Sequence, residues 1–168
     1  TEFMAALLTS VLDQSTKVSQ YIYEARKMGI KLLPPDINES YDGFTVSGDS
    51  IRFGLVAVKN VGRNVILALI EEREKKGPFR SFKDFCERMH ERDINKRCVE
   101  SLIKSGAFDC LKVHRSQLMA AYEKIMDGIS QSRKVNLVGQ ISLFGNEYNN
   151  GQLLDEQDDL PYMDEYPI

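Results

Sequence analysis

The chain has 168 residues, 42% of them hydrophobic, enough to pack a core in one domain with a tail or in two small units. Its longest apolar stretches, such as Met4 to Leu8, are far shorter than a bilayer span, and nothing resembles a secretory signal. The three cysteines, at uneven spacing, suit reduced thiols. We therefore expect a cytoplasmic protein without a membrane partner. Because the chain opens directly in helix-like sequence, we also expect a fragment of something longer.

The formal net charge of -3 averages two unlike regions. Residues 146–168 hold seven acidic residues and no Lys or Arg, which leaves 22 basic against 18 acidic residues in 1–145. Residues 52–104 alone hold thirteen basic and eight acidic residues. This modest excess is compatible with a polyanionic partner and equally with an ordinary solvated surface. The acidic end is typical of a linker.

Apolar residues at helical spacing predict helices from Phe3 to about Leu12 and from Thr16 to Met28. Ser15 can cap the second helix and Gly29 can end it. The apolar stripe of this helix is Val18, Ile22, Ala25 and Met28.

A strand pattern appears once along the chain. The chain must leave the helix before Pro34, because a residue that precedes proline is disfavoured in the α region. Residues 44–46 and 51–53, separated by 47–50, then predict a small β-hairpin.

From residue 54 onward the pattern predicts short helices joined by glycine turns. The first turn is 58–62, before a helix that ends at Gly77-Pro78. The caps Ser81 and Asn95 predict the next two helices. The last predicted helix runs from about Arg115 to Gln131. The expected buried side chains are Val65, Ile66, Leu69, Ile70, Phe82, Phe85, Met89, Val99, Leu102, Ile103, Leu118, Tyr122, Ile125 and Ile129.

The sequence thus predicts a mainly α fold in which the unit helix, glycine turn, helix occurs twice. We divide it into a helical remnant with the β-hairpin at 1–53, a tandem helix-hairpin-helix domain at 54–131, and a flexible segment at 132–168. Phe108, in the second glycine turn, is the expected wedge between helices.

The first glycine turn has the residues needed to hold a phosphate group. A tight turn before a helix points several backbone N–H groups, and the positive end of the helix, at one phosphate. Gly62 allows a close approach to the backbone, Asn60 tolerates the left-handed region, and Val61 lies between them. Lys59 and Arg63 flank the turn. We expect sequence-independent contacts with duplex DNA here; an ordinary helix-helix turn is the alternative.

The second turn, 105–109, is a poorer phosphate site because Asp109 adds negative charge. We expect it to be structural, with the nearby cations Lys96, Arg97 and Lys104 as secondary DNA contacts.

No catalytic or metal site is expected. Cys86 and His90, like Cys110 and His114, have the i, i+4 spacing of metal ligands, but Cys86 falls on an apolar helix face where free cysteine acts as a small core residue. No aspartate pair suggests two-metal chemistry, and no cofactor site is apparent.

Near the end of the chain lies a short peptide with a glutamine followed by two apolar residues. Gln140 can donate and accept in a polar notch, while Leu143 and Phe144 can enter an apolar groove on a partner. Ile141 and Ser142 complete the peptide, which resembles the internal sliding-clamp-binding peptide of bacterial replicative DNA polymerases. Packing of Leu143 and Phe144 on their own domain is the alternative.

These features together resemble the alpha (catalytic) subunit of bacterial DNA polymerase III. The resemblance covers about residues 1–145, from the end of the fingers region to the clamp-binding peptide, and the end of the chain is similar to the family's linker. One departure is Asn60, where members usually carry glycine. The matching stretches are 3–9, 33–38, 51–55, 58–62, 82–86, 95–97, 100–109 and 140–145.

The resemblance implies that this chain binds duplex DNA and attaches to the sliding clamp (beta subunit), alongside the remaining domains of the parent polymerase. The family's catalytic acidic residues do not lie in this stretch, so DNA-directed DNA polymerase activity, a nucleotidyl transfer, would belong to the parent. Two other classes remain open: a helix-hairpin-helix module of a repair or ligase protein without clamp binding, and a purely architectural helical domain.

Overall fold

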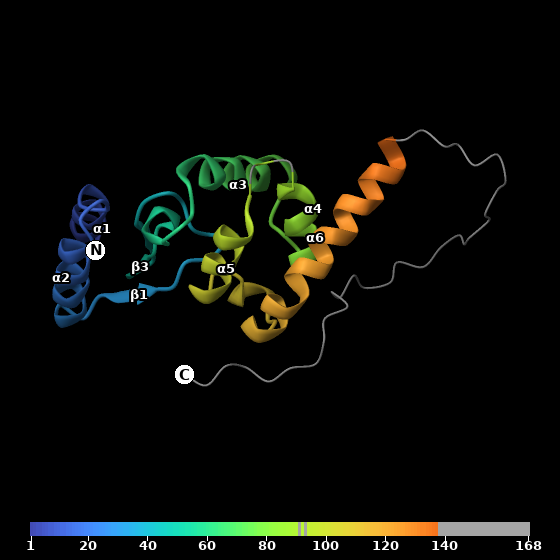
Figure 1. Ribbon diagram of the computed structural model, residues 1–168. Coiled ribbons are helices and arrows are strands. Elements are labelled where there is room, and N and C mark those ends of the chain that lie inside the picture. Colours follow the sequence, from blue (N-terminus) through green and yellow to red (C-terminus); the bar gives the residue numbers. More distant parts are fainter. Residues whose placement is uncertain (91, 93, 138–168) are drawn as a thin grey trace.

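The structure is a computed structural model that describes residues 1–90, 92 and 94–137. Its described part is mainly α, as predicted, with a three-stranded sheet (Figure 1). The α-helices are α1 (Glu2–Ser10), α2 (Ser15–Lys27), α3 (Arg63–Lys76), α4 (Phe82–Met89), α5 (Lys96–Lys104) and α6 (Arg115–Leu137). The strands are β1 (Lys31–Leu33), β2 (Thr45–Ser47) and β3 (Ser50–Arg52), and two 3-10 turns are η1 (Leu55–Ala57) and η2 (Asp109–Leu111).

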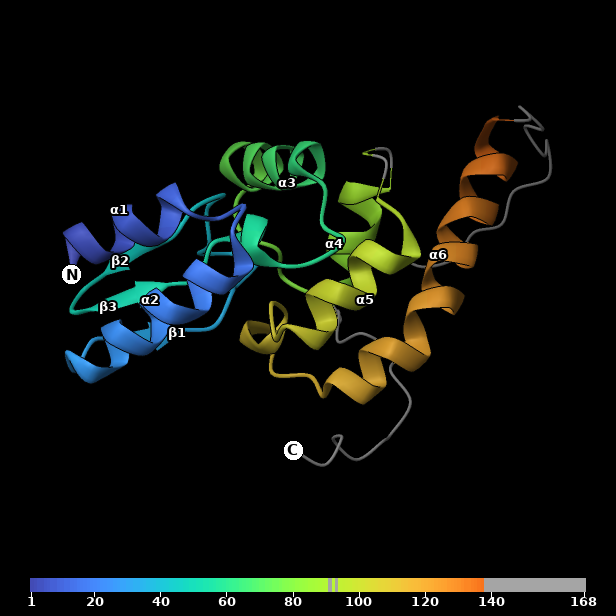
Figure 2. The ribbon, with the colours of Figure 1, turned by 60° about the vertical axis from the view of Figure 1, so that its left-hand side comes forward.

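The sheet lies with α1 and α2 at one end of the molecule, opposite the far end of α6 (Figure 2). Strands β2 and β3 form the predicted antiparallel hairpin, with Val46 opposite Ile51. Strand β1 was not predicted; it pairs parallel to β3, with Leu32 opposite Ile51. No short turn joins β1 to β3, which lies 17 residues further along the chain, so the sequence near β1 has no hairpin signal like that between β2 and β3.

Two expectations for α2 are wrong. The N-cap is Gln14, without a side-chain cap bond, and Ser15 is already helical. Met28 is 66% exposed, because α2 ends one residue earlier and its buried stripe ends at Ala25. Gly29 ends the helix as predicted, at φ +75°.

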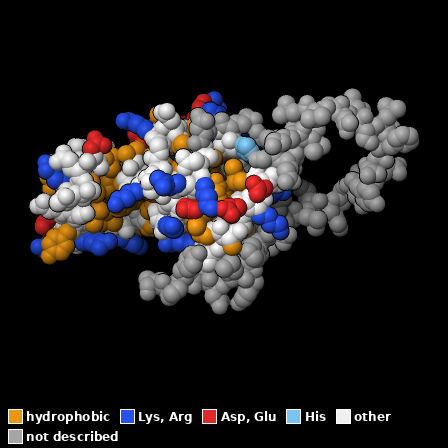
Figure 3. Space-filling view, in the orientation of Figure 1, with side chains coloured by type: hydrophobic (Ala, Val, Ile, Leu, Met, Phe, Trp, Pro, Cys, Tyr) orange, Lys and Arg blue, Asp and Glu red, His pale blue; other side chains and the backbone are white. Residues whose placement is uncertain are grey.

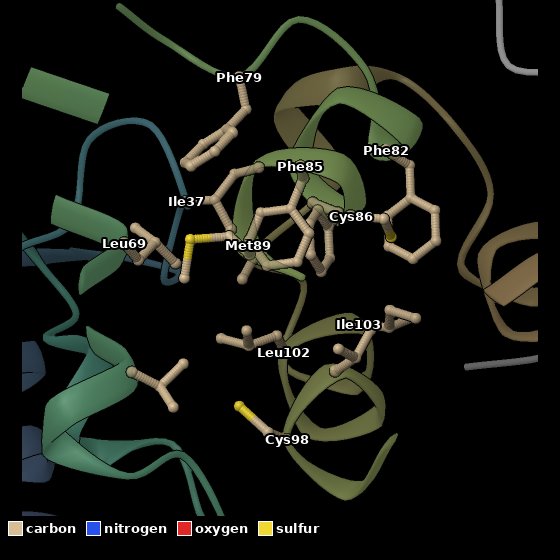
Figure 4. Packing of buried hydrophobic residues seen from close by; sticks show 14 of the residues in the cluster. Ile37, Leu69, Phe79, Phe82, Phe85, Cys86, Met89, Cys98, Leu102 and Ile103 are labelled. Carbon is tan, nitrogen blue, oxygen red and sulfur yellow. The ribbon is translucent and has the colours of Figure 1, made fainter. Parts of the chain in front are cut away.

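The larger core combines side chains from both glycine-turn units (Figure 4). Leu69 of α3 and Leu102 of α5 are both buried in it. Phe108 meets the rings of Phe82 and Phe85 edge-on, at centroid distances of 5.0 and 4.9 Å. It is therefore the wedge that was predicted, and such pairs add about 0.5–1.5 kcal/mol beyond their buried area.

Helices α4 and α5 begin at the cap residues that the sequence predicted, Ser81 and Asn95. The Ser81 hydroxyl accepts a hydrogen bond from the Asp84 N–H at 3.0 Å, and the Asn95 side chain accepts one from the Cys98 N–H at 2.9 Å. Helix α6 runs to residue 137 instead of the predicted 131, because residues 132–137 contain no glycine or proline. The predicted flexible segment is therefore helical at its start. The rest of it, including Gln140 to Phe144, lies outside the described residues.

The N-terminal unit, residues 1–53, has a smaller core of its own, in which Leu8 of α1 and Ile51 of β3 are fully buried. Its loop at residues 34–44 inserts into the larger core. Ile37 is fully buried there; its N–H donates to the Ala107 carbonyl at 2.9 Å, and its carbonyl accepts from Arg73 at 2.9 Å. The Asn38 side chain bonds both backbone groups of Phe79, at 2.7 and 3.0 Å. The two cores are thus joined by packing and hydrogen bonds, while the predicted division at 53/54 remains a prediction.

Candidate nucleic-acid interface

The first glycine turn connects η1 to α3 and is open on its outer side. Gly62 is the N-cap of α3, at φ -69° and ψ 144°, and no side chain caps the helix. The first N–H groups of a helix lack intrahelical partners and carry the positive end of its dipole. This helix start is therefore able to accept an anionic group.

Neither the backbone conformation nor the packing of the free protein requires glycine at position 62, although glycine is among the favoured N-cap residues. The φ of Gly62 is one that any residue adopts, it is exposed, and a Cβ added there would meet no atom within 4 Å. A residue without a side chain at this place instead permits close approach of something outside the chain.

The rest of the turn is held by Asn60 and Val61. Asn60 adopts the left-handed conformation predicted for it, at φ +62°. Its side-chain amide donates to the Ser101 hydroxyl of α5 at 3.2 Å, which links the first glycine turn to the second helix–glycine turn–helix unit. Val61 packs against the larger core. These two residues fix the shape of the turn.

The two cations beside the turn differ in whether a carboxylate lies near them. Lys59 is exposed and has no ion-pair partner among the described residues. The Arg63 side chain is 74% exposed and lies 3.7 Å from the Asp42 carboxylate. Both flank the turn, as the sequence predicted, and both can reach a phosphate from the exposed surface.

The three secondary cations, all on α5, are in different surroundings. Lys104 lines the same cleft as Lys59. Arg97 is exposed and, among the described residues, unpaired. Lys96 forms ion pairs with Glu123 and Glu100, and the hydrogen bond to Glu123, followed by its charge, raises the Lys96 pKa. Much of the Lys96 charge is thus already compensated within the fold.

The second turn is closed by an ion pair. Gly106 adopts φ +84°, and an added Cβ would lie 2.5 Å from Arg115 Nη2. Arg115 donates to the Asp109 carboxylate at 2.9 and 2.5 Å and to the Lys104 carbonyl at 3.3 Å. A phosphate here would have to displace the carboxylate. This supports the structural role predicted for the turn. The part that Arg115 plays in it was not predicted, because its pairing with Asp109 joins two elements.

Cys86 is 1% exposed in the larger core, which agrees with its predicted packing role.

Within residues 1–90, 92 and 94–137, no three or more His, Cys, Asp or Glu side chains are grouped so as to hold a metal ion. None of the helices in the described part is both long and apolar enough to span a membrane.

The paired hairpin elements, the shared core and the open first turn define a helix-hairpin-helix domain. The family described as "Helix-hairpin-helix motif" matches residues 29–118, and the chain belongs to that family. Its match begins before the predicted boundary at 53/54 and includes the inserted loop.

The curated relatives then specify the protein within that class. The chain is 46% identical to DNA polymerase III subunit alpha of Saccharopolyspora erythraea over 86% of its length, and 46% identical to that of Thermus aquaticus over 85%. The corresponding subunit of Deinococcus radiodurans is 44% identical over 87%. The chain spans only about 12% of the length of the first two and 11% of the third. It fits a fragment of a DNA polymerase III alpha subunit.

Proposed function

We propose that this chain is the duplex-DNA-binding and clamp-binding part of a bacterial replicative DNA polymerase, which acts in the cytoplasm and needs no cofactor for either contact. The observation that carries the proposal is the first turn. A helix start without a side-chain cap, an exposed glycine that neither φ nor packing requires, and two exposed cations meet there. Backbone N–H groups and cations read phosphates and not bases, so the expected binding is independent of sequence.

Attachment to the sliding clamp is the second part of the proposal. It rests on Gln140, Leu143 and Phe144 and on the relatives' name, DNA polymerase III subunit alpha. In this function the parent chain performs nucleotidyl transfer, and this piece holds the duplex and the clamp. A repair or ligase module would bind the duplex and not the clamp.

The duplex contact is tested with Lys59→Ala/Arg63→Ala. We expect the wild type to bind blunt duplex weakly, with log affinity falling against log salt by about 0.9 per phosphate neutralised. The double variant should bind more weakly and with a slope flatter by about one to two phosphates. Fluorescence anisotropy over a salt series measures both quantities.

A matched control is Lys75→Ala/Lys76→Ala, which removes the same charge from the other end of α3, where both lysines are ion-paired. It should leave the slope nearly unchanged. Equal slopes in the wild type and the Lys59→Ala/Arg63→Ala protein would contradict the site.

A further inference from the structure

A cleft of about 700 Å³ lies between the N-terminal unit, the first turn and α5. Arg26 of α2, Lys59 of the turn and Lys104 of α5 approach it from three elements. Leu33, Pro34 and Phe53 supply apolar surface. Its volume falls in the range of about 300–1,000 Å³ typical of ligand sites.

The charges of the cleft are of one sign. None of its lining residues is Asp or Glu. Among the described residues no carboxylate forms an ion pair with Arg26, Lys59 or Lys104. Most basic side chains of α3 and α4, in contrast, are paired with carboxylates. In Figure 3, Lys and Arg side chains lie over the middle of the molecule among apolar side chains and several Asp and Glu, so the single sign of charge belongs to the cleft lining and not to the whole face. The complementary ligand has negative groups and a flat apolar part.

The cleft is continuous with the first turn, because Val58 and Lys59 belong to both. A strand whose phosphate lies at Gly62 can therefore continue past Lys59 into it. Unpaired nucleotides have exposed base faces that stack on aromatic and apolar side chains, and phosphates that suit unpaired cations. An acidic peptide would match the charges but would have no reason to follow the turn.

We propose that this cleft binds the unpaired nucleotides that adjoin a duplex end held at the first turn. The proposal rests on the proposed duplex contact and adds a second ligand class, single-stranded nucleic acid, to the same surface. It gives Arg26, outside the matched hairpin elements, a direct role in holding the strand.

The test compares binding of the whole chain to a blunt duplex and to the same duplex with a short unpaired extension on either strand. We expect one extended duplex to bind about fivefold more tightly than the blunt one, from stacking and added phosphate contacts. Arg26→Gln should remove most of this gain while leaving blunt-duplex affinity within about twofold. Pro34→Glu, which puts a carboxylate at the exposed rim, should remove it fully.

Two controls make the comparison specific. Lys17→Gln removes an exposed positive charge from the same helix, outside the cleft, and should keep the gain; Arg26→Lys should restore it. Helical content and thermal midpoint, by circular dichroism, should be unchanged in all variants.

Equal affinity for blunt and extended duplexes, or an equal loss of the gain in Lys17→Gln and Arg26→Gln, would overturn the proposal. So would Arg26-dependent binding of a synthetic peptide of residues 153–168 with no gain from the extension, which would make the cleft an acidic-peptide site. A chain that binds the extended but not the blunt duplex would refute the duplex contact at the first turn and would support only the binding of unpaired nucleotides in the cleft. A chain that binds neither refutes both.

Discussion

The two turn glycines, Gly62 and Gly106, stand in opposite situations. Gly62 has an ordinary φ and open space beside it, whereas Gly106 has φ +84° and the Arg115 guanidinium against it. A glycine required by the fold and a glycine required by a ligand respond differently to the same substitution. This contrast gives the most direct test of the first turn.

Gly62→Ala should change the free energy of unfolding by less than about 1 kcal/mol, because the N-cap residue has room for a methyl group. It should nevertheless weaken duplex binding by about tenfold, since the methyl group keeps a phosphate from the backbone N–H groups. Urea unfolding and anisotropy titration measure the two effects.

Gly106→Ala is the matched control and should show the reverse. Strain at positive φ and the contact with Arg115 should cost about 1–2 kcal/mol of stability, with duplex affinity of the folded protein nearly unchanged. If Gly62→Ala destabilised the protein as much as Gly106→Ala and bound duplex normally, Gly62 would have only a structural role.

At the scale of elements, the junction between the two units depends on the loop at 34–44. Asn38 satisfies the N–H and the carbonyl of Phe79, which is 2% exposed. Asn38→Ala should cost about 1–3 kcal/mol, because a buried N–H would lose its partner. Urea unfolding checks this.

Asn64→Ala, an exposed change on α3 without a side-chain hydrogen bond among the described residues, is its control and should stay within about 0.5 kcal/mol of wild type. Two separate unfolding transitions in the wild type would show that the loop does not couple the cores.

The sequence predicted those elements whose signals are local. Ser81 and Asn95 mark helix starts because each cap bonds an N–H three residues on. Strand β1, the burial of Ile37 and the Asp109–Arg115 pair depend on partners from other elements, and no spacing rule reaches them. In the site, the turn and its flanking cations were predictable, while the pairing of Lys96 and the cleft near Arg26 required the structure.

For the whole molecule, the proposed clamp contact is weak alone and effective when tethered. Leu143 and Phe144 would each contribute roughly 1.5–3 kcal/mol, and Gln140 about 0.5–1.5 kcal/mol, so the contact should be no tighter than about micromolar. Phe144→Ala should abolish capture of the chain by a bacterial sliding clamp. Surface-immobilised clamp and a concentration series measure this.

Phe3→Ala, which truncates an aromatic residue that is 77% exposed on α1, serves as the control and should leave capture intact. The thermal midpoint should not move in Phe144→Ala. A wild type that never binds the clamp, together with a Phe144→Ala protein that melts early, would indicate that this side chain packs on its own domain. On a shared duplex the proposed clamp contact would form at an effective concentration near millimolar, so even a weak contact would hold the chain at the clamp.

The buried Ile37 has a mechanical consequence under the proposed mode of binding. A turn that holds a strand by its phosphates follows the helical path of that strand, which completes a rotation in about 10.5 base pairs. Because the Ile37 loop fixes the N-terminal unit to the larger core, that unit cannot swivel freely while the turn advances. Torque generated at the DNA backbone would therefore pass through this joint into the N-terminal unit.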